Sequence, residues 1–184
     1  ISKYSTDLDK LHSLNALSRK ICAEKPELSQ IQKELSEIDG RKVYPFAVQC
    51  AAFALIAGAF TIFFGGNFID AAAAAVIGAV LKVVVYIADK SAVNMVFANV
   101  VSSFILWSLA FLCVFIGFGE HVDMIIIGNI MLLIPGIGLT NSIRDIVSGD
   151  IMAGMLRFCE SVIIAVAIAA GYILSALLLG GLIR

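Results

Sequence analysis

An apolar run stops at a Pro-Gly pair and becomes polar in the segment Met131-Leu132-Leu133-Ile134-Pro135-Gly136-Ile137-Gly138-Leu139-Thr140-Asn141-Ser142-Ile143-Arg144-Asp145. Proline has no backbone N–H, and its ring strains a helix at the carbonyl four residues earlier, here that of Met131. Within a bilayer, backbone groups freed in this way persist only against protein or a water-filled cavity. The segment therefore predicts a broken membrane helix and is typical of a transporter's substrate or ion site.

The composition is that of an integral membrane protein. Of the 184 residues 60% are hydrophobic and 15% are charged, and the mean hydropathy is +0.98, whereas soluble domains have about 45–50% apolar residues. With a net charge of −1 and no basic tract, the chain has no feature of a nucleic-acid-binding protein. The four cysteines have no metal or redox spacing, so neither a metal nor a cofactor is predicted.

Two amphipathic helices are predicted at the start of the chain, before the membrane part. Apolar residues recur at helical spacing at Leu8, Leu11, Leu14, Leu17 and Ile21, and again at Leu28, Ile31, Leu35 and Ile38. We therefore expect residues 1–42 to form a cytoplasmic helical hairpin and residues 43–184 to form a transmembrane domain.

Five apolar runs predict five transmembrane helices, at about 44–64, 71–88, 93–117, 122–139 and 152–182. The second run is the doubtful one, because it is short and contains Lys82. If all five cross and the N-terminus is cytoplasmic, eleven of the thirteen Lys and Arg residues lie inside, Arg184 lies outside and Lys82 lies in the bilayer. Without the second crossing the division is nine against four, so the positive-inside rule favours five spans and an external C-terminus.

The polar residues of the membrane part predict a binding site around the broken helix. The predicted substrate-binding residues are Asn129, Pro135, Gly136, Thr140, Asn141, Arg144 and Asp145, and the predicted coupling or ion-pair residues are Asp70, Arg157 and Glu160. A broken helix exposes amides at one end, which suit a carboxylate, and carbonyls at the other, which suit an ammonium group or a cation. A buried Glu that titrates near neutral pH would suit proton exchange.

Each charged residue also has a structural interpretation. Arg144 and Arg157 are alternatively anchors at the cytoplasmic interface, and Lys82 is alternatively a snorkelling residue. Asp145 is alternatively a turn residue, and Glu160 is alternatively half of a structural ion pair with one of the two arginines.

The chain offers little for catalysis. Neither His12 nor His121 has ligand spacing to a carboxylate or a cysteine, and the sequence contains no Ser-centred nucleophile elbow and no phosphate-binding glycine loop. His121 lies between Glu120 and Asp123, but a solvated loop explains these three residues better than a metal site. We therefore expect a protein that is not an enzyme.

The motifs resemble those of the threonine/serine exporter family of prokaryotic inner-membrane proteins. The resemblance rests on Leu133-Ile134-Pro135-Gly136 with Thr140-Asn141 and Arg144-Asp145, then Ser148-Gly149-Asp150, Gly154, Arg157 and Glu160, on Phe64-Gly65-Gly66 followed by Asp70, and on Leu14-Asn15-Ala16-Leu17-Ser18-Arg19. It implies a secondary exporter of threonine and serine or of a dicarboxylate such as succinate, driven by the membrane gradient. It also implies a partner, a second hydrophobic half of about five spans, which an odd span count allows to pair in an inverted pseudo-two-fold arrangement.

Two further hypotheses remain open. One is a non-catalytic membrane scaffold whose cytoplasmic hairpin recruits a partner protein. The other is a membrane hydrolase, since the chain begins with Ile rather than Met and we expect upstream sequence that would have to supply its nucleophile and base.

Overall fold

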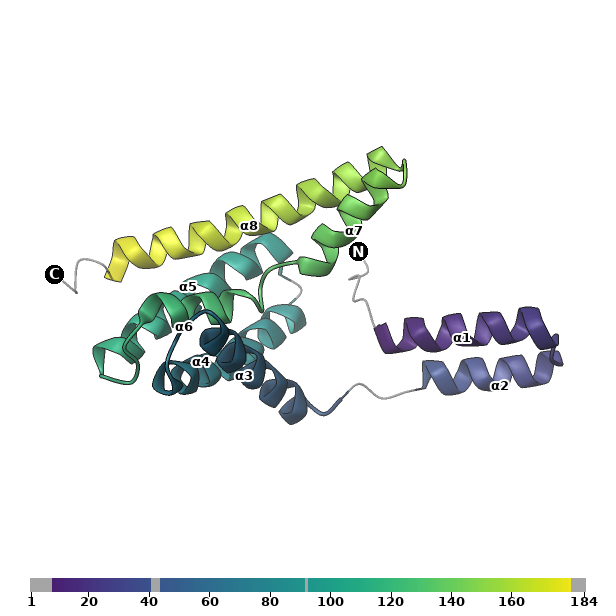
Figure 1. Cartoon of the computed structure of the whole chain (residues 1–184), viewed down its shortest axis with the longest axis horizontal. Coiled ribbons are helices and arrows are strands. Elements are labelled where there is room, and N and C mark those ends of the chain that lie inside the picture. Colours follow the sequence, from purple (N-terminus) through teal and green to yellow (C-terminus); the bar gives the residue numbers. More distant parts are fainter. Residues whose placement is uncertain (1–7, 41–43, 92, 180–184) are drawn as a thin grey trace. The chain divides into compact units, whose positions relative to one another are not determined.

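The computed structural model describes residues 8–40, 44–91 and 93–179, and these residues form eight α-helices and no β-strand. The chain divides into two compact units, residues 1–44 and residues 45–184. Figure 1 shows the helices in chain order.

The first unit is a pair of antiparallel helices, α1 (Leu8–Glu24) and α2 (Leu28–Asp39). Leu17 and Ile38 are buried between them, at 6% and 9% exposure. Ion pairs join the outer faces: Lys20 Nζ lies 2.5 Å from Glu34 Oε1, and Lys10 Nζ lies 3.2 Å from Asp39 Oδ1. The predicted apolar stripes are thus only partly covered in this unit, because Leu11, Leu14, Leu28 and Leu35 stay exposed.

The second unit contains α3 (Phe46–Phe63), α4 (Phe68–Lys90), α5 (Met95–Phe115), α6 (Val122–Ile130), α7 (Gly136–Val147) and α8 (Ile151–Leu179). Four of these helices, α3, α4, α5 and α8, are long and apolar enough to cross a membrane. The chain is therefore a multi-pass membrane protein. The doubtful second run lies in α4, a continuous helix of 23 residues.

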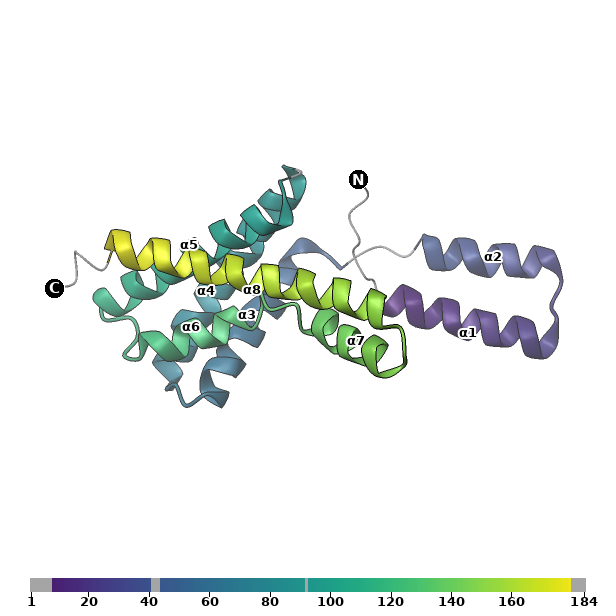
Figure 2. The same ribbon diagram turned by 90° about the horizontal axis from the view of Figure 1, so that it is seen from above.

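The segment predicted as a single fourth span, residues 122–139, is divided between two short helices. α6 ends at Ile130 after nine residues, and α7 starts at Gly136 and continues to Val147, so neither has the length of a spanning helix by itself. The two follow one another in the same general direction, and α8 returns antiparallel to α7 (Figure 2). Whether α6 and α7 together make a fifth crossing stays a prediction.

Small residues bring the helix backbones together. A Cβ atom on Gly78 of α4 would lie 2.8 Å from Phe53 O of α3, and one on Gly128 of α6 would lie 2.8 Å from Ala57 O of α3. At the other side of the unit, a Cβ on Gly171 of α8 would lie 2.4 Å from Val100 O of α5. Close approach at small residues is how helices associate where lipid removes the hydrophobic driving force.

α6 lies at the centre of this packing. It contacts α3, α4 and α5, and Ile125, Ile126, Gly128 and Asn129 are buried among the nine residues. The apolar core around it is formed by Ala57, Ala73, Ala74, Ile77, Leu81, Leu106, Ala110, Ile125 and Ile126. The end of α6 is therefore held rigidly inside the helical unit.

Candidate functional site at the interruption between α6 and α7

The chain between α6 and α7 makes a tight turn at Pro135. Pro135 has φ −77° and ψ 61°, and Gly136 N donates to Ile134 O at 2.8 Å, which together form an inverse γ-turn. Pro135 has no N–H to offer to Met131 O. In the part of the chain that the structure describes, the carbonyl oxygens of Met131, Leu132 and Leu133 accept no hydrogen bond.

The start of α7 leaves backbone donors without partners. Its N-cap residue is Pro135, which provides no side-chain cap. Leu139 N donates to Pro135 O at 3.0 Å, but the amides of Ile137 and Gly138 have no acceptor among residues 8–40, 44–91 and 93–179. Free amides at a helix N-terminus, together with the helix dipole, favour a bound anion.

The length of α6 bears on the depth that this turn would have in a bilayer. Nine residues rise about 13 Å, which is close to half of the roughly 30 Å hydrocarbon thickness. If α6 enters at the bilayer surface, its last residue, Ile130, lies near the midplane. Transporters with discontinuous helices bind their substrates at that depth.

Asn129, in the last turn of α6, has an unsatisfied acceptor. Its side chain is fully buried, and Nδ2 donates to Ile125 O at 3.0 Å. This bond fixes the orientation of the amide, because a carbonyl oxygen accepts only from the nitrogen. Oδ1 then points elsewhere, and it has no hydrogen-bond partner among the described residues.

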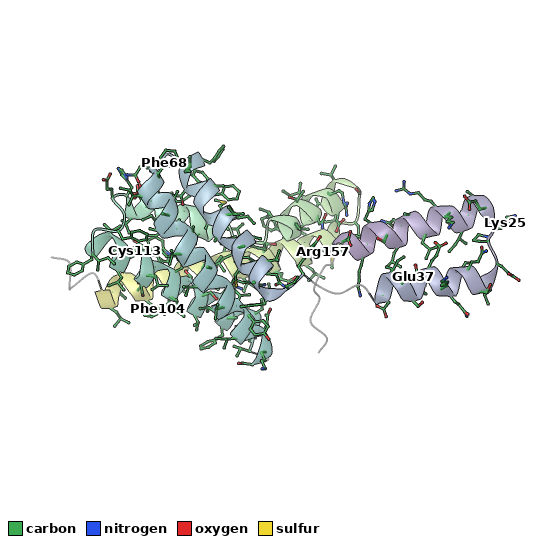
Figure 3. All side chains as sticks on the ribbon, turned by 90° about the horizontal axis from the view of Figure 1, so that it is seen from below. Lys25, Glu37, Phe68, Phe104, Cys113 and Arg157 are labelled. Atoms are coloured by element: carbon green, nitrogen blue, oxygen red, sulfur yellow. The ribbon has the colours of Figure 1, made fainter. Side chains whose placement is uncertain are left out.

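α8 packs along α7 and brings two predicted residues into contact. Arg157 Nη1 donates to Asp145 Oδ2 at 2.7 Å, and Figure 3 labels Arg157. Arg144 Nη2 lies 3.8 Å from Asp145 Oδ1. Asp145 is 19% exposed, whereas Arg157 is 53% exposed and Arg144 is 70% exposed. The carboxylate of Asp145 therefore lies beside two guanidinium groups that still reach outward.

Gly138 and Gly154 set the spacing between α7 and α8. A Cβ on Gly138 would lie 3.3 Å from Ser161 Oγ, and a Cβ on Gly154 would lie 2.8 Å from Ser142 O. The uncapped start of α7 is thus directly next to Ser161, the residue that follows Glu160.

The other predicted residues of this site, on α7 and α8, make no hydrogen bond or ion pair with the Asp145–Arg157 pair within the described ranges. Thr140 Oγ1 donates to Gly136 O at 2.9 Å and is exposed. Asn141 is half-buried. Glu160 is exposed on α8, and no hydrogen bond or ion pair joins it to the part of the chain that the structure describes. Glu160 is therefore not half of the ion pair that Arg157 makes, at least within this chain.

Asp70 lies at the opposite end of α6. Its fully buried carboxylate accepts from Glu120 N at 2.7 Å, His121 N at 3.1 Å and Asn67 N at 3.0 Å, and His121 Nδ1 lies 2.8 Å from Oδ2. Asn67 Oδ1 accepts from Asp70 N, and together the two form a capping box that starts α4. The cluster ties the α3–α4 loop to the α5–α6 loop.

The pairing of His121 with Asp70 was missed by the sequence reasoning. The hydrogen bond to Asp70 is the main cause that raises the pKa of His121 above 6.5. Glu120, His121 and Asp123 do not form a metal site: among the residues described, no three His, Cys, Asp or Glu side chains are placed so that they could hold a metal ion. The only local signal was the Asn67-to-Asp70 spacing, which indicates a helix start but not its partner.

Lys82 is half-buried in the middle of α4. Its Nζ lies 5.0 Å from the centre of the Phe53 ring on α3, within cation–π distance. No carboxylate pairs with it in the described part of the chain. The structure thus gives Lys82 an aromatic neighbour within its own helical unit.

Comparison with known proteins agrees with the resemblance noted in the sequence. The family model described as "Putative threonine/serine exporter" matches residues 1–180, nearly the whole chain. The chain belongs to the threonine/serine exporter family. A curated member of this exporter family, the threonine/serine exporter of Corynebacterium glutamicum, is 26% identical over 176 residues. No solved structure matches the chain significantly.

The match covers 93% of this chain but only 36% of that relative. The chain thus spans about a third of the length of that threonine/serine exporter. The family is one of membrane exporters rather than of enzymes.

Proposed function

We propose that this chain is one half of a secondary exporter for small hydrophilic metabolites in a prokaryotic inner membrane. The observation that carries the proposal is the interruption between α6 and α7, where the chain leaves carbonyls and a buried amide oxygen on one side of the turn, and helix-start amides on the other, without partners among the described residues. Such paired ends bind the two charges of a small zwitterion or an anion with its coupling cation. The family of the chain supports the same function.

Within this proposal, the substrate carboxylate binds the amides of Ile137 and Gly138, and Arg144, in the last turn of the same helix, is the cation that α7 supplies. An amino acid such as threonine or serine satisfies both ends of the interruption. A dicarboxylate such as succinate would need a second cation, which Arg157 supplies only if its bond to Asp145 at 2.7 Å opens. The geometry therefore favours the amino acid.

The coupling proton is assigned to Glu160. Its carboxylate is exposed on α8 and has no partner in the described chain, so protonation breaks no existing bond. Asp70 is less suited, because four donors already occupy its oxygens at the far end of α6.

The exporter requires a second half. The relative is much longer than this chain, and the charged residues Arg144, Arg157 and Glu160 lie on surfaces that this chain does not cover. We propose that a second hydrophobic half of about five spans covers them, in an inverted pseudo-two-fold arrangement, with five crossings in this half, a cytoplasmic N-terminus and an external C-terminus.

The test is efflux from vesicles loaded with labelled threonine, serine or succinate, containing the chain alone, the chain with its second half, or the Glu160→Gln variant of either. We expect efflux only with the second half, and its loss in Glu160→Gln with assembly intact. Asp123→Asn is a matched control, since it also removes one exposed carboxylate, outside the proposed site.

A scaffold that recruits a partner through α1 and α2 is the alternative. Absence of efflux with all three substrates from a well-assembled complex would contradict the exporter proposal and favour the scaffold. Removal of residues 1–42 distinguishes the two, because only the scaffold loses its function while the membrane unit stays assembled.

A further inference from the structure

The interruption contains an unsatisfied acceptor whose burial cannot be explained by packing alone. Asn129 is fully buried and Oδ1 accepts no hydrogen bond from the described residues. Leaving such an atom unpaired in the interior destabilises the folded protein. A leucine of similar size would avoid that cost, so an asparagine at this position indicates a group that Oδ1 binds.

The chemistry around Asn129 selects a cation. Asn129 Oδ1 belongs to the last turn of α6. Directly after it in the chain, the backbone carbonyl oxygens of Met131, Leu132 and Leu133 also accept no hydrogen bond from the described residues. All four atoms are neutral oxygens that accept hydrogen bonds. The C-terminal end of a helix carries partial negative charge from its dipole. Unwound carbonyls with a side-chain oxygen are the ligands that bind sodium or an ammonium group in discontinuous membrane helices.

We propose that the C-terminal end of α6, with Asn129 Oδ1 as the side-chain ligand, is a binding site for a monovalent cation. The ligand is either an alkali ion or the ammonium group of the transported amino acid. The inference rests on the proposed function, because it names the chemistry of one end of the same interruption. Asn129 is a binding residue, whereas the free amides of α7 take the anion.

The neighbouring side chains agree with this assignment. The nearest acidic group in sequence is Asp123, which is almost two turns earlier and exposed in the first turn of α6. No carboxylate is therefore supplied by α6 near its end, and neutral oxygens hold the cation weakly enough to release it in each cycle. Trp107 Nε1 is also buried and has no partner in the described part of the chain, but it is a donor and cannot bind a cation.

The test is thermal unfolding of the full chain in detergent at constant pH and ionic strength. The probes are sodium chloride against choline chloride, and threonine against N-acetylthreonine, which keeps the carboxylate but lacks the ammonium group. Ligands that bind only the folded state raise the melting temperature in a saturable way. We expect one of the two probes to raise it by a few degrees.

The decisive variant is Asn129→Leu, and its matched control is Asn99→Leu. Asn99 on α5 also donates Nδ2 to the carbonyl four residues earlier, Met95 O at 2.9 Å. We expect Asn129→Leu to fold at least as well as the wild type, because it removes an unpaired buried acceptor, and to lose the response entirely. Asn99→Leu should keep it.

The outcomes are distinct. A sodium response that Asn129→Leu abolishes identifies an alkali ion, and a threonine response absent with N-acetylthreonine identifies the ammonium group. If the wild type responds to neither, or if Asn129→Leu responds like the wild type, the cation site is overturned. Efflux measured separately with the second half decides the exporter proposal: efflux retained in Asn129→Leu would overturn only the cation site, whereas a cation response without efflux would overturn only the transport function.

Discussion

Asp70 shows how a single buried charge can hold two loops together. Three backbone amides and the imidazole of His121 surround its oxygens at 2.7–3.1 Å. A buried carboxylate is tolerated when all of its acceptor positions are used, and it becomes costly when a partner is lost. The cluster therefore fixes the start of α4 against the start of α6.

Replacing Asp70 by asparagine should destabilise the folded protein. The amide presents N–H groups to donors that require acceptors, so at least one backbone amide loses its partner, and we expect a loss of about 2–3 kcal/mol. Denaturant unfolding in detergent measures this loss. Asp123→Asn, at an exposed position of α6, is the comparison, and an equal effect at both positions would contradict the special role of Asp70.

His121 should make stability depend on pH. Its pKa is raised from 6.5 by the bond to Asp70 and by the charges of Asp70, Glu120 and Asp123. The stabilisation is then complete below pH 6.5 and is lost as the pH rises through the higher pKa of the folded state. As the pH rises above 6.5, the melting temperature of the wild type should therefore fall, whereas that of His121→Gln should not. An identical pH slope in the two proteins would contradict the assignment.

At the scale of elements, small residues decide how closely the helix backbones approach each other. Gly171 of α8 packs directly onto α5, where Ser103 Oγ also donates to Ile168 O at 2.6 Å. Gly136, at the start of α7, has no atom within 4 Å of the position that a Cβ would occupy. The same substitution at these two glycines should therefore have opposite effects.

Gly171→Ala should destabilise the unit by about 1–3 kcal/mol, because the added atom must displace Val100 O of α5. Gly136→Ala should be neutral or stabilising by up to about 1 kcal/mol, since it only restricts the unfolded chain. Melting temperatures of both variants in the same detergent make the comparison. Similar losses in both variants would mean that α5 and α8 do not meet at Gly171.

The residue pattern predicts that several of the helices exist, but it does not predict where they begin and end. The second apolar run begins at Ala71, but α4 starts at Phe68, because Asn67 caps the helix through Asp70. The interruption at Pro135 was predictable, since the missing N–H is a covalent property. The extension of α7 to Val147 was not, because its polar residues are supported by packing on α8.

At the scale of the whole molecule, the number of crossings decides the position of the C-terminus. Four helices are long enough to span a membrane alone, and α6 with α7 would supply a fifth crossing in two pieces. Alkaline phosphatase fused after residue 184 should therefore be active, since it folds only outside the cytoplasm. The matched fusion after Lys90 should be inactive. An inactive C-terminal fusion with a stable product would indicate four crossings.

The sequence by itself determined the helical class, the membrane location, the break at Pro135 and the family, because these depend on composition, on periodicity and on one missing backbone donor. Only the tertiary structure decided which charges meet. Asp70 reaches His121 across 51 positions, and Arg157 pairs with Asp145 rather than with Glu160. The side-chain oxygen of Asn129 has no partner among the residues that the structure describes. These partners depend on how contacts at glycine and alanine bring the helices together, and the distance between helices that are far apart in the chain cannot be predicted from a local sequence pattern.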